Sequence, residues 1–515
     1  MKRNKIYLAA ATFLMLTFLS TSCTNDFEKI NTNNNALSLE KAAPDMLLTN
    51  AIESMTSRVH EIFLGHEMGS CWVQHMAKVQ YTDEDRYIPR MSVINNTWTS
   101  FYASSGMDIN LIYQLGVDTN NPSYQGVALI LKSYVASVLT DEFGAVPYTE
   151  AWLGSSSETP IVSPKYDTQE SIYVALLANL EQANTLLDEG SEIGGDILFD
   201  GDLMKWKKFA NSLRLRLLLR RSDRVDPTAD MTAMVSNPAM YPIFESNNDD
   251  AELHYLASAP NNNPINENRK TRDDHRVSKT LVDKMWNSGA AEPDYRIMAY
   301  AKTEATGDFV GMPNGMLSAD AVGYLGNGLA NTSKLGDYFT AATAPGVLMS
   351  YSELQFILAE AAHRNFISGG EAAAETFYVE GISSSYYKYT SEIEAGVVSL
   401  YGTSPGDYVV DDMLEWFLAD GGYVYNTANA TKQIATQKWV AMFGQGLQAA
   451  FEWRRTGYPV LIPAIDGANG GKIPVRAYYP SDEAARNNAN LSAAVTAQGA
   501  DNLNTRVWWD AADNY

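Results

Sequence analysis

The sequence predicts a mostly α-helical protein, with long irregular loops and little β-structure. Apolar residues recur at steps of three and four through most of the chain, as they do along one stripe of a helix. The 515 residues are 45% hydrophobic and 19% charged, which is the composition of a folded protein with a sizeable core. Between residues 225 and 348 the periodicity gives way to Pro, Asn, Gly and Asp. We therefore expect one domain over residues 41–515 with a loop-rich insert.

Residues 1–22 are predicted to be a signal peptide. A basic start precedes an apolar run, and small residues then lead to Cys23. The apolar run is too short to span a bilayer as a stable helix. The arrangement resembles the lipobox of bacterial lipoproteins, so Cys23 is the expected site of lipid attachment. The alternative is an ordinary secretory signal with an incidental cysteine. Residues 23–40, which are polar and rich in Asn, are expected to form a lipidated tether to a membrane that the protein does not cross.

Helices are expected on both sides of the loop-rich insert. Those before it cover residues 44–76 (interrupted near Gly65 and Gly69), 97–115, 124–139, 168–187 and 202–221. After the insert, Ser350 and Glu353 have the spacing of a capping box, and a partner helix is expected over residues 370–389. The packing positions of a tetratricopeptide helix pair, small-small-large-small at intervals of 12, 4 and 3, are matched by Ala362, Ala374, Tyr378 and Gly381.

Residues 437–459 are expected to form one buried helix that ends at Gly457, before Pro459. Gly444 and Gly446 fall inside it, and each costs about 1 kcal/mol relative to alanine in a helix. We expect this cost to be offset by the close approach of another helix backbone. The charged residues among the apolar surface, Glu452, Arg454 and Arg455, are expected to pair with each other or with loop carbonyls.

Composition and spacing exclude several classes of function. A net charge of −23 without a basic patch excludes nucleic-acid binding. Two cysteines cannot provide a disulfide framework for 515 residues. Cys71 and His75 share a helix face but have no third ligand, so no metal site is expected. No cofactor is predicted, and a structural calcium ion is possible but supported by no motif. No catalytic motif is complete, which indicates a protein that is not an enzyme.

Aromatic residues in or beside the loops are the candidate ligand-binding residues. Flat rings stack on the apolar faces of sugars, and neighbouring polar side chains bind hydroxyl groups. Taken one by one, such rings are more commonly part of a core, but some of the set are expected to line a site. The candidates are Trp72, Tyr81, Tyr87, Trp98, Trp286, Tyr295 and Tyr324.

Four segments together resemble one known family. They are Cys23 followed by DFEKINTNNN, DEFGAVPYTEAW (residues 141–152), MSYSELQFILAEAAHR (residues 349–364), and EWRRTGYP at the end of the predicted helix 437–459. Their order and spacing are similar to those of the SusD/RagB-type nutrient-binding outer-membrane lipoproteins, in particular the second SusD-like branch.

The resemblance implies tetratricopeptide-like helix pairs that carry the ligand site on irregular loops. It also implies a non-enzymatic lipoprotein on the outside of the outer membrane, which binds oligosaccharides or peptides and passes them to a SusC-like TonB-dependent transporter. The resemblance does not indicate which residues of this chain bind the ligand. A secreted glycan hydrolase and a helical-repeat scaffold for proteins are the alternatives.

Overall fold

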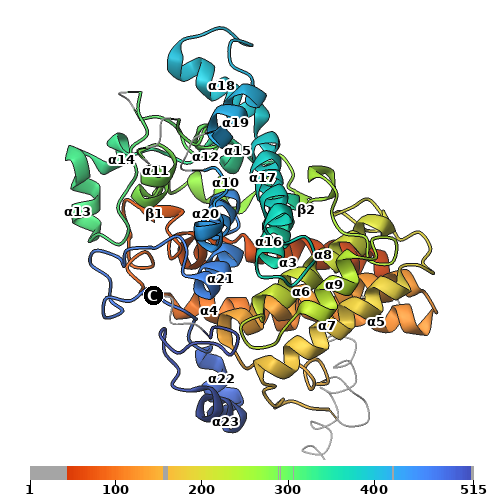
Figure 1. Ribbon diagram of the computed structural model, residues 1–515. Helices are drawn as coiled ribbons and strands as arrows, with labels where there is room; N and C mark the ends of the chain where they lie inside the picture. Colours follow the sequence, from red (N-terminus) through yellow and green to blue (C-terminus); the bar gives the residue numbers. More distant parts are fainter. Residues whose placement is uncertain are drawn as a thin grey trace, which may run out of the picture.

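The computed structural model describes residues 43–154, 160–287, 289, 292–304, 307–419 and 423–511. The predicted signal peptide, Cys23 and the tether lie outside these residues. The described chain is mostly helical, with two sheets of two strands each (Figure 1). The predicted fold class is confirmed. No helix among the described residues is long and apolar enough to span a membrane.

The N-terminal part is a series of helices that pack on their neighbours in sequence, with α5 against α6, α6 against α7 and α7 against α8. Figure 1 shows them side by side in the lower half of the molecule. Asn121, Thr168 and Asp202 cap α6, α7 and α8 by accepting hydrogen bonds from the first backbone N–H groups. The elements are α3 (Pro44–Val59), η2 (Ile62–Ser70), β1 (Met76–Lys78), α4 (Met91–Thr99), η3 (Ser100–Ser104), α5 (Ser105–Asp118), α6 (Pro122–Phe143), α7 (Gln169–Leu186) and α8 (Leu203–Arg220).

The predicted tetratricopeptide-like pair is formed by α16 (Tyr351–His363) and α17 (Gly370–Lys388), which pack along each other. Ser350 caps α16 as its spacing predicted, because its hydroxyl accepts the Glu353 N–H at 3.2 Å. A Cβ at Gly381 would lie 2.9 Å from the Phe356 ring. The missing side chain therefore lets the two helices approach closely.

The prediction of a single helix over residues 437–459 is wrong. The chain instead forms α20 (Ala430–Ala441) and α21 (Gly446–Thr456), because Gly444 adopts a φ of +86° in the link between them. The expected close approach does occur, at the start of α21. A Cβ at Gly446 would lie 2.0 Å from the Gly65 carbonyl oxygen, and one at Gly69 would lie 2.6 Å from the Gly446 carbonyl carbon. Gly457 ends α21 with a φ of +70°, as predicted.

The loop-rich insert consists of short elements; one antiparallel strand pair joins it to the N-terminal helices, and a second pairs its beginning with its end. Strand β1 pairs with β3 (His275–Val277), and β2 (Ala251–His254) pairs with β4 (Pro345–Met349). The other elements of the insert are α9 (Thr228–Val235), η4 (Asn247–Asp249), α10 (Pro264–Arg269), α11 (Lys279–Met285), α12 (Ile297–Tyr300), α13 (Ser318–Gly323), η5 (Tyr324–Gly326), α14 (Gly328–Asn331) and α15 (Asp337–Thr340).

The remaining elements follow α17 and α21. They are α18 (Thr390–Tyr401), α19 (Val410–Ala419), η6 (Thr427–Asn429), α22 (Ser481–Arg486) and α23 (Asn488–Gln498). The C-terminal segment then returns to the body. The fully buried indole of Trp509 donates a hydrogen bond to Asp141 Oδ1 of α6 at 2.7 Å.

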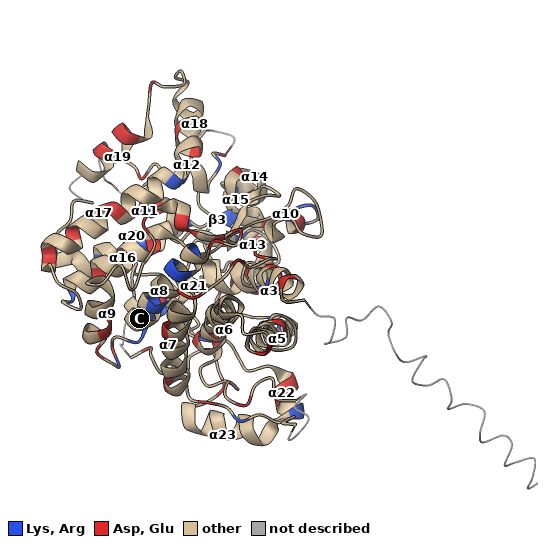
Figure 2. Cartoon of the chain, turned by 90° about the vertical axis from the view of Figure 1, so that its right-hand side faces the viewer, with Lys and Arg blue, Asp and Glu red and all other residues tan. Residues whose placement is uncertain are grey.

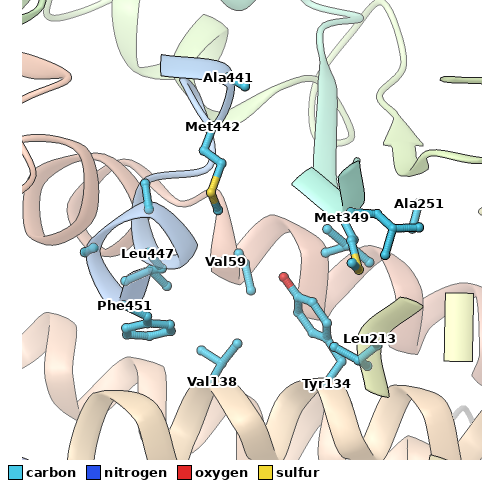
Figure 3. Close-up of a cluster of buried hydrophobic side chains, with 14 of the residues drawn as sticks. Val59, Tyr134, Val138, Leu213, Ala251, Met349, Ala441, Met442, Leu447 and Phe451 are labelled. Carbon is cyan, nitrogen blue, oxygen red and sulfur yellow. The ribbon is translucent and has the colours of Figure 1, made fainter. Parts of the chain in front are cut away.

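The core lies where α3, α6, α8, β4 and α21 meet. Val59, Tyr134, Leu213, Met349 and Phe451 converge there from these five elements (Figure 3). Burying side chains of this size stabilises a fold by about 1.5–3 kcal/mol each.

A network of buried ion pairs crosses this core. Figure 2 shows the basic residues of α8 and α21 gathered in the middle of the molecule, while acidic residues are spread over its outer helices. The pairs are Arg216–Glu353 at 2.5 Å, Arg220–Asp141 at 2.6 Å, Arg454–Glu142 at 3.1 Å, Arg455–Glu360 at 2.5 Å, and Arg455–Glu452. Every acidic member belongs to one of the segments that carry the family resemblance.

Candidate functional site

Three segments that are distant in the sequence meet beside the β1–β3 sheet. They are residues 79–90, 312–326 and 462–468, and we call them the three-loop face. Figure 1 shows α13, which belongs to the second segment, on the same side of the molecule as β1.

The side chain of Asp85 links residues 79–90 to residues 312–326. Its buried carboxylate accepts hydrogen bonds from the Lys78 N–H at 3.1 Å, the Gly315 N–H at 2.9 Å and Asn314 Nδ2 at 2.8 Å. Burial raises the pKa of Asp85 to about 6, and the three hydrogen bonds limit that rise. One side chain therefore sets the separation of residues 79–90 and 312–326.

The third segment is held by backbone hydrogen bonds. Ile465 N–H donates to the Asn314 carbonyl at 3.1 Å, and Asp466 N–H donates to the Gly315 carbonyl at 2.9 Å. Arg86 Nε donates to the Asp466 carbonyl at 3.0 Å. These bonds link all three segments, so the face has a defined shape although it consists largely of loops.

The outer surface of this face carries apolar side chains in unusual backbone conformations. Tyr81 is 53% exposed with a φ of +52°, and Leu325 is 54% exposed with a φ of +51°. Positive φ is rare for bulky residues, and such strain concentrates at ligand-binding sites. Other exposed apolar residues on the face are Leu317, Val322, Ile462 and Ile465.

Two neighbours hold Tyr81, one at its backbone and one at its ring. Its backbone N–H donates to Ser318 Oγ at 3.0 Å, and the Arg272 guanidinium lies 4.5 Å from the centre of the ring. A cation over one ring face leaves the remaining ring surface open to a ligand. The arrangement can stack on a flat apolar surface and can donate hydrogen bonds from Arg272 beside it.

Four of the seven predicted aromatic residues come together here, at different depths. Trp72 and Tyr87 are buried beneath the face, where the Trp72 indole donates to the Glu84 carbonyl at 2.9 Å and the Tyr87 hydroxyl accepts the Ala464 N–H at 2.8 Å. Tyr324 is half-buried and packs against the small cluster that contains Val79. Tyr81 is thus the member of this group with a largely exposed ring.

A buried charge cluster supports the face. Lys78 lies 2.5 Å from Glu67 and 3.7 Å from Asp274, and His275 lies between the same two carboxylates. Burial lowers the pKa of His275, but the hydrogen bonds and charges of Asp274 and Glu67 raise it overall. Within the described residues, no group of His, Cys, Asp or Glu has the arrangement needed to hold a metal ion.

Trp98 lies elsewhere, in a groove of about 500 Å³. Its ring is 4.8 Å from that of Tyr102, which is 5.7 Å from that of Trp152. The Trp152 indole donates to the Tyr102 carbonyl at 2.8 Å. Sequence reasoning selected Trp98 but missed its two partners. The end of the DEFGAVPYTEAW segment contains Trp152, but no local pattern indicated that its ring meets Tyr102.

The last two predicted residues lie near α11 and α12. The Trp286 indole donates to Asp308 Oδ1 at 2.8 Å, and its ring is 5.0 Å from that of Phe309. Tyr295 is buried, and its hydroxyl donates to Glu292 at 2.9 Å. The predicted set is therefore divided among three regions.

A model of the family SusD-like_2, described as "Starch-binding associating with outer membrane", matches residues 34–480. The chain belongs to this SusD-like family. None of the curated proteins matches the chain.

Solved structures of SusD homologues have the same fold. A chitin-binding protein is 27% identical with a TM-score of 0.75, covering 91% of this chain and 100% of that one. A SusD homologue from Bacteroides fragilis NCTC 9343 is 24% identical with a TM-score of 0.72, covering 91% and 99%. A chitin-binding SusD homologue from Flavobacterium johnsoniae is 23% identical with a TM-score of 0.71, covering 92% and 99%. The last two similarities, at below 25% identity, concern the fold alone.

Proposed function

We propose that this SusD-like protein binds oligosaccharides at the three-loop face and passes them to a SusC-like TonB-dependent transporter. The exposed Tyr81 ring, which lies against Arg272 and whose backbone is held by Ser318, is the observation that carries the proposal. A fixed aromatic ring binds the apolar face of a sugar without losing much conformational entropy. Arg272 can donate hydrogen bonds to the hydroxyl groups of the same ligand.

The family description and the names of the related structures support a glycan rather than a peptide as the ligand. The description refers to starch, and the similar structure at 27% identity is named as a chitin-binding protein. The proposal includes lipid attachment at Cys23 and a position on the outside of the outer membrane. It also includes the absence of enzymatic activity.

Calorimetric titration of the mature chain without lipid tests the ligand. The panel consists of malto-oligosaccharides, chito-oligosaccharides and short peptides. Tyr81→Ala is expected to weaken oligosaccharide binding about five- to tenfold, because a stacked ring contributes about 1 kcal/mol. The matched control is Tyr387→Ala on α17, since Tyr387 is 49% exposed and lies on another element.

Three results would contradict the proposal. Binding of no oligosaccharide by the intact chain would favour a protein scaffold. Release of new reducing ends during incubation would indicate a hydrolase. Equal loss of affinity in Tyr81→Ala and Tyr387→Ala would show that the three-loop face is not the site. For the anchor, Cys23→Ser is expected to move the protein from the membrane fraction to the soluble fraction.

A further inference from the structure

A second pocket, which shares no lining residue with the three-loop face, opens between α12, α15 and α18. Its volume is about 600 Å³, which is within the range of small-molecule sites. One wall is α12 with the segment that follows it, the second is the start of α15, and the third is one face of α18. Figure 1 shows these three helices close together in the upper part of the molecule.

The wall formed by α18 is one face of that helix, because the main lining residues are spaced four positions apart in the sequence. Ser391, Ala395 and Ser399 are exposed towards the pocket, and Glu392 and Gly396 lie beside them. A Cβ at Gly396 would lie 2.6 Å from Met298 Cβ of α12. The missing side chain allows α12 and α18 to approach at the base, while short side chains keep the space above it open.

The opposite wall carries charge. Lys302 Nζ lies 2.5 Å from Asp337 Oδ1, and the side chains are 42% and 83% exposed, respectively. An exposed ion pair of this kind contributes at most about 1 kcal/mol, so a ligand can replace either partner at little cost. With Glu392 across the pocket, this wall offers an ammonium group and a carboxylate that face hydroxyl groups and a second carboxylate.

Two aromatic residues belong to the lining. Tyr338 and Phe309 line the pocket, and burial raises the pKa of Tyr338 to about 12, so its phenol remains a hydrogen-bond donor. Phe309 is backed by the Trp286 ring at 5.0 Å, whose indole is anchored to Asp308. Trp286 is therefore a positioning residue for this pocket, which is a more specific role than the sequence indicated.

We infer that this pocket is a second binding site for a short neutral glycan of one or two sugar units. Hydroxyl, carboxylate and ammonium groups line it together with aromatic residues, which is the combination that a polyhydroxylated ring requires. Groups of both signs are present, so the site does not select for a charged ligand. The inference goes beyond the proposed function, because the pocket and the three-loop face share no residue.

Methyl NMR of the mature chain labelled at methionine can observe both sites at once. Met298 lines the pocket, and Met316 packs in the small cluster beneath the three-loop face. The probes are maltose and N,N′-diacetylchitobiose. At least one probe is expected to shift the Met298 methyl signal. Ala395→Phe, which fills the pocket from an exposed position, is expected to abolish this shift and to leave that of Met316 unchanged.

The control for the added ring is Ala372→Phe, at an exposed position of α17 outside the pocket, and it should leave both shifts intact. Asp337→Asn should weaken the Met298 response about tenfold, since it removes a charged acceptor. If Met316 responds and Met298 does not, the pocket proposal is wrong and the proposed function stands. If neither responds, the pocket proposal is wrong, and the calorimetric titration with oligosaccharides decides the proposed function. A Met298 response that survives Ala395→Phe would also overturn the pocket assignment.

Discussion

Individual charged residues explain why short segments are diagnostic of this family. Arg455 on α21 binds Glu360 on α16 and Glu452 on its own helix. Burial by itself raises the pKa of Glu452, but the neighbouring cations, with Arg455 first among them, lower it overall. A buried charge of this kind is tolerated only with its partner in place, so the segments that supply the partners must occur together.

Replacing Arg455 with methionine tests this interdependence. The variant leaves Glu360 and Glu452 without their main cation, and we expect a loss of about 3–5 kcal/mol in the free energy of unfolding. Urea denaturation followed by circular dichroism measures it. Arg486→Met is the control, because Arg486 and its partner Asp482 are exposed and the pair should contribute at most about 1 kcal/mol. Similar losses in both variants would refute the role of the network.

Sequence reasoning identified one half of this network and could not find the other. Pairing among Glu452, Arg454 and Arg455 was one of the two expected outcomes, and Glu452 and Arg455 do pair, three positions apart on one helix. Glu360 is 95 residues away from Arg455, and only the fold brings it close. The same limit applies to the candidate site. Tyr81 was selected as a loop aromatic, whereas Arg272 and Ser318, which hold it, have no local pattern.

At the level of elements, the helices were predictable and their interruptions were not. Apolar periodicity indicated α6, α7 and α8 within a few residues of their observed ends, and the capping box indicated the start of α16. The helix predicted over residues 437–459 continued through Gly444 because its apolar stripe does so. A tertiary contact overrides this local helical pattern. The backbone of η2 lies against Gly446, and the chain must turn before α21 can take that position.

Gly446→Ala tests this contact between η2 and α21. A Cβ there would lie 2.0 Å from the Gly65 carbonyl oxygen and 2.5 Å from the Ser70 nitrogen, which are backbone atoms that cannot rotate away. We expect a loss of about 1–3 kcal/mol in the free energy of unfolding, although alanine is intrinsically the better helix former. Thermal denaturation measures the change.

Gly323→Ala is the matched control for this substitution. A Cβ at Gly323 would have no neighbour within 4 Å, and its φ is −78°, which any residue adopts. Its stability should remain within about 0.5 kcal/mol of the parent. A Gly446→Ala variant as stable as the parent would show that the two backbones separate without cost.

At the scale of the whole molecule, the acid response combines opposing contributions. Burial lowers the pKa of His60 to about 4 and that of His75 to about 3, so both stay neutral in the folded chain. Their contribution to stability is present above a pH of about 6.5 and is lost as the pH falls towards these values. The raised pKa values of His275 and Asp85 act in the opposite direction. The change in the free energy of unfolding with pH is therefore a sum over several groups and cannot be assigned to one of them.

The contribution of His75 can be isolated by comparing the free energy of unfolding of the parent with that of a variant at this position. His75 is fully buried, with Nε2 2.8 Å from the Trp439 carbonyl, and the side-chain amide of His75→Gln can donate the same hydrogen bond without titrating. The stability difference between parent and variant should shift by about 2 kcal/mol in favour of the variant between pH 7 and pH 5. Urea denaturation at both pH values measures this shift.

His254→Gln provides the opposite sign as a control. His254 is exposed, and its hydrogen bond with Glu252 raises its pKa, so the protonated form stabilises the folded chain. As the pH falls, the His254→Gln variant should therefore become slightly less stable relative to the parent. If the His75→Gln difference is the same at pH 7 and pH 5, then His75 does not remain neutral in the folded core, and the acid sensitivity of this fold has its origin in other groups.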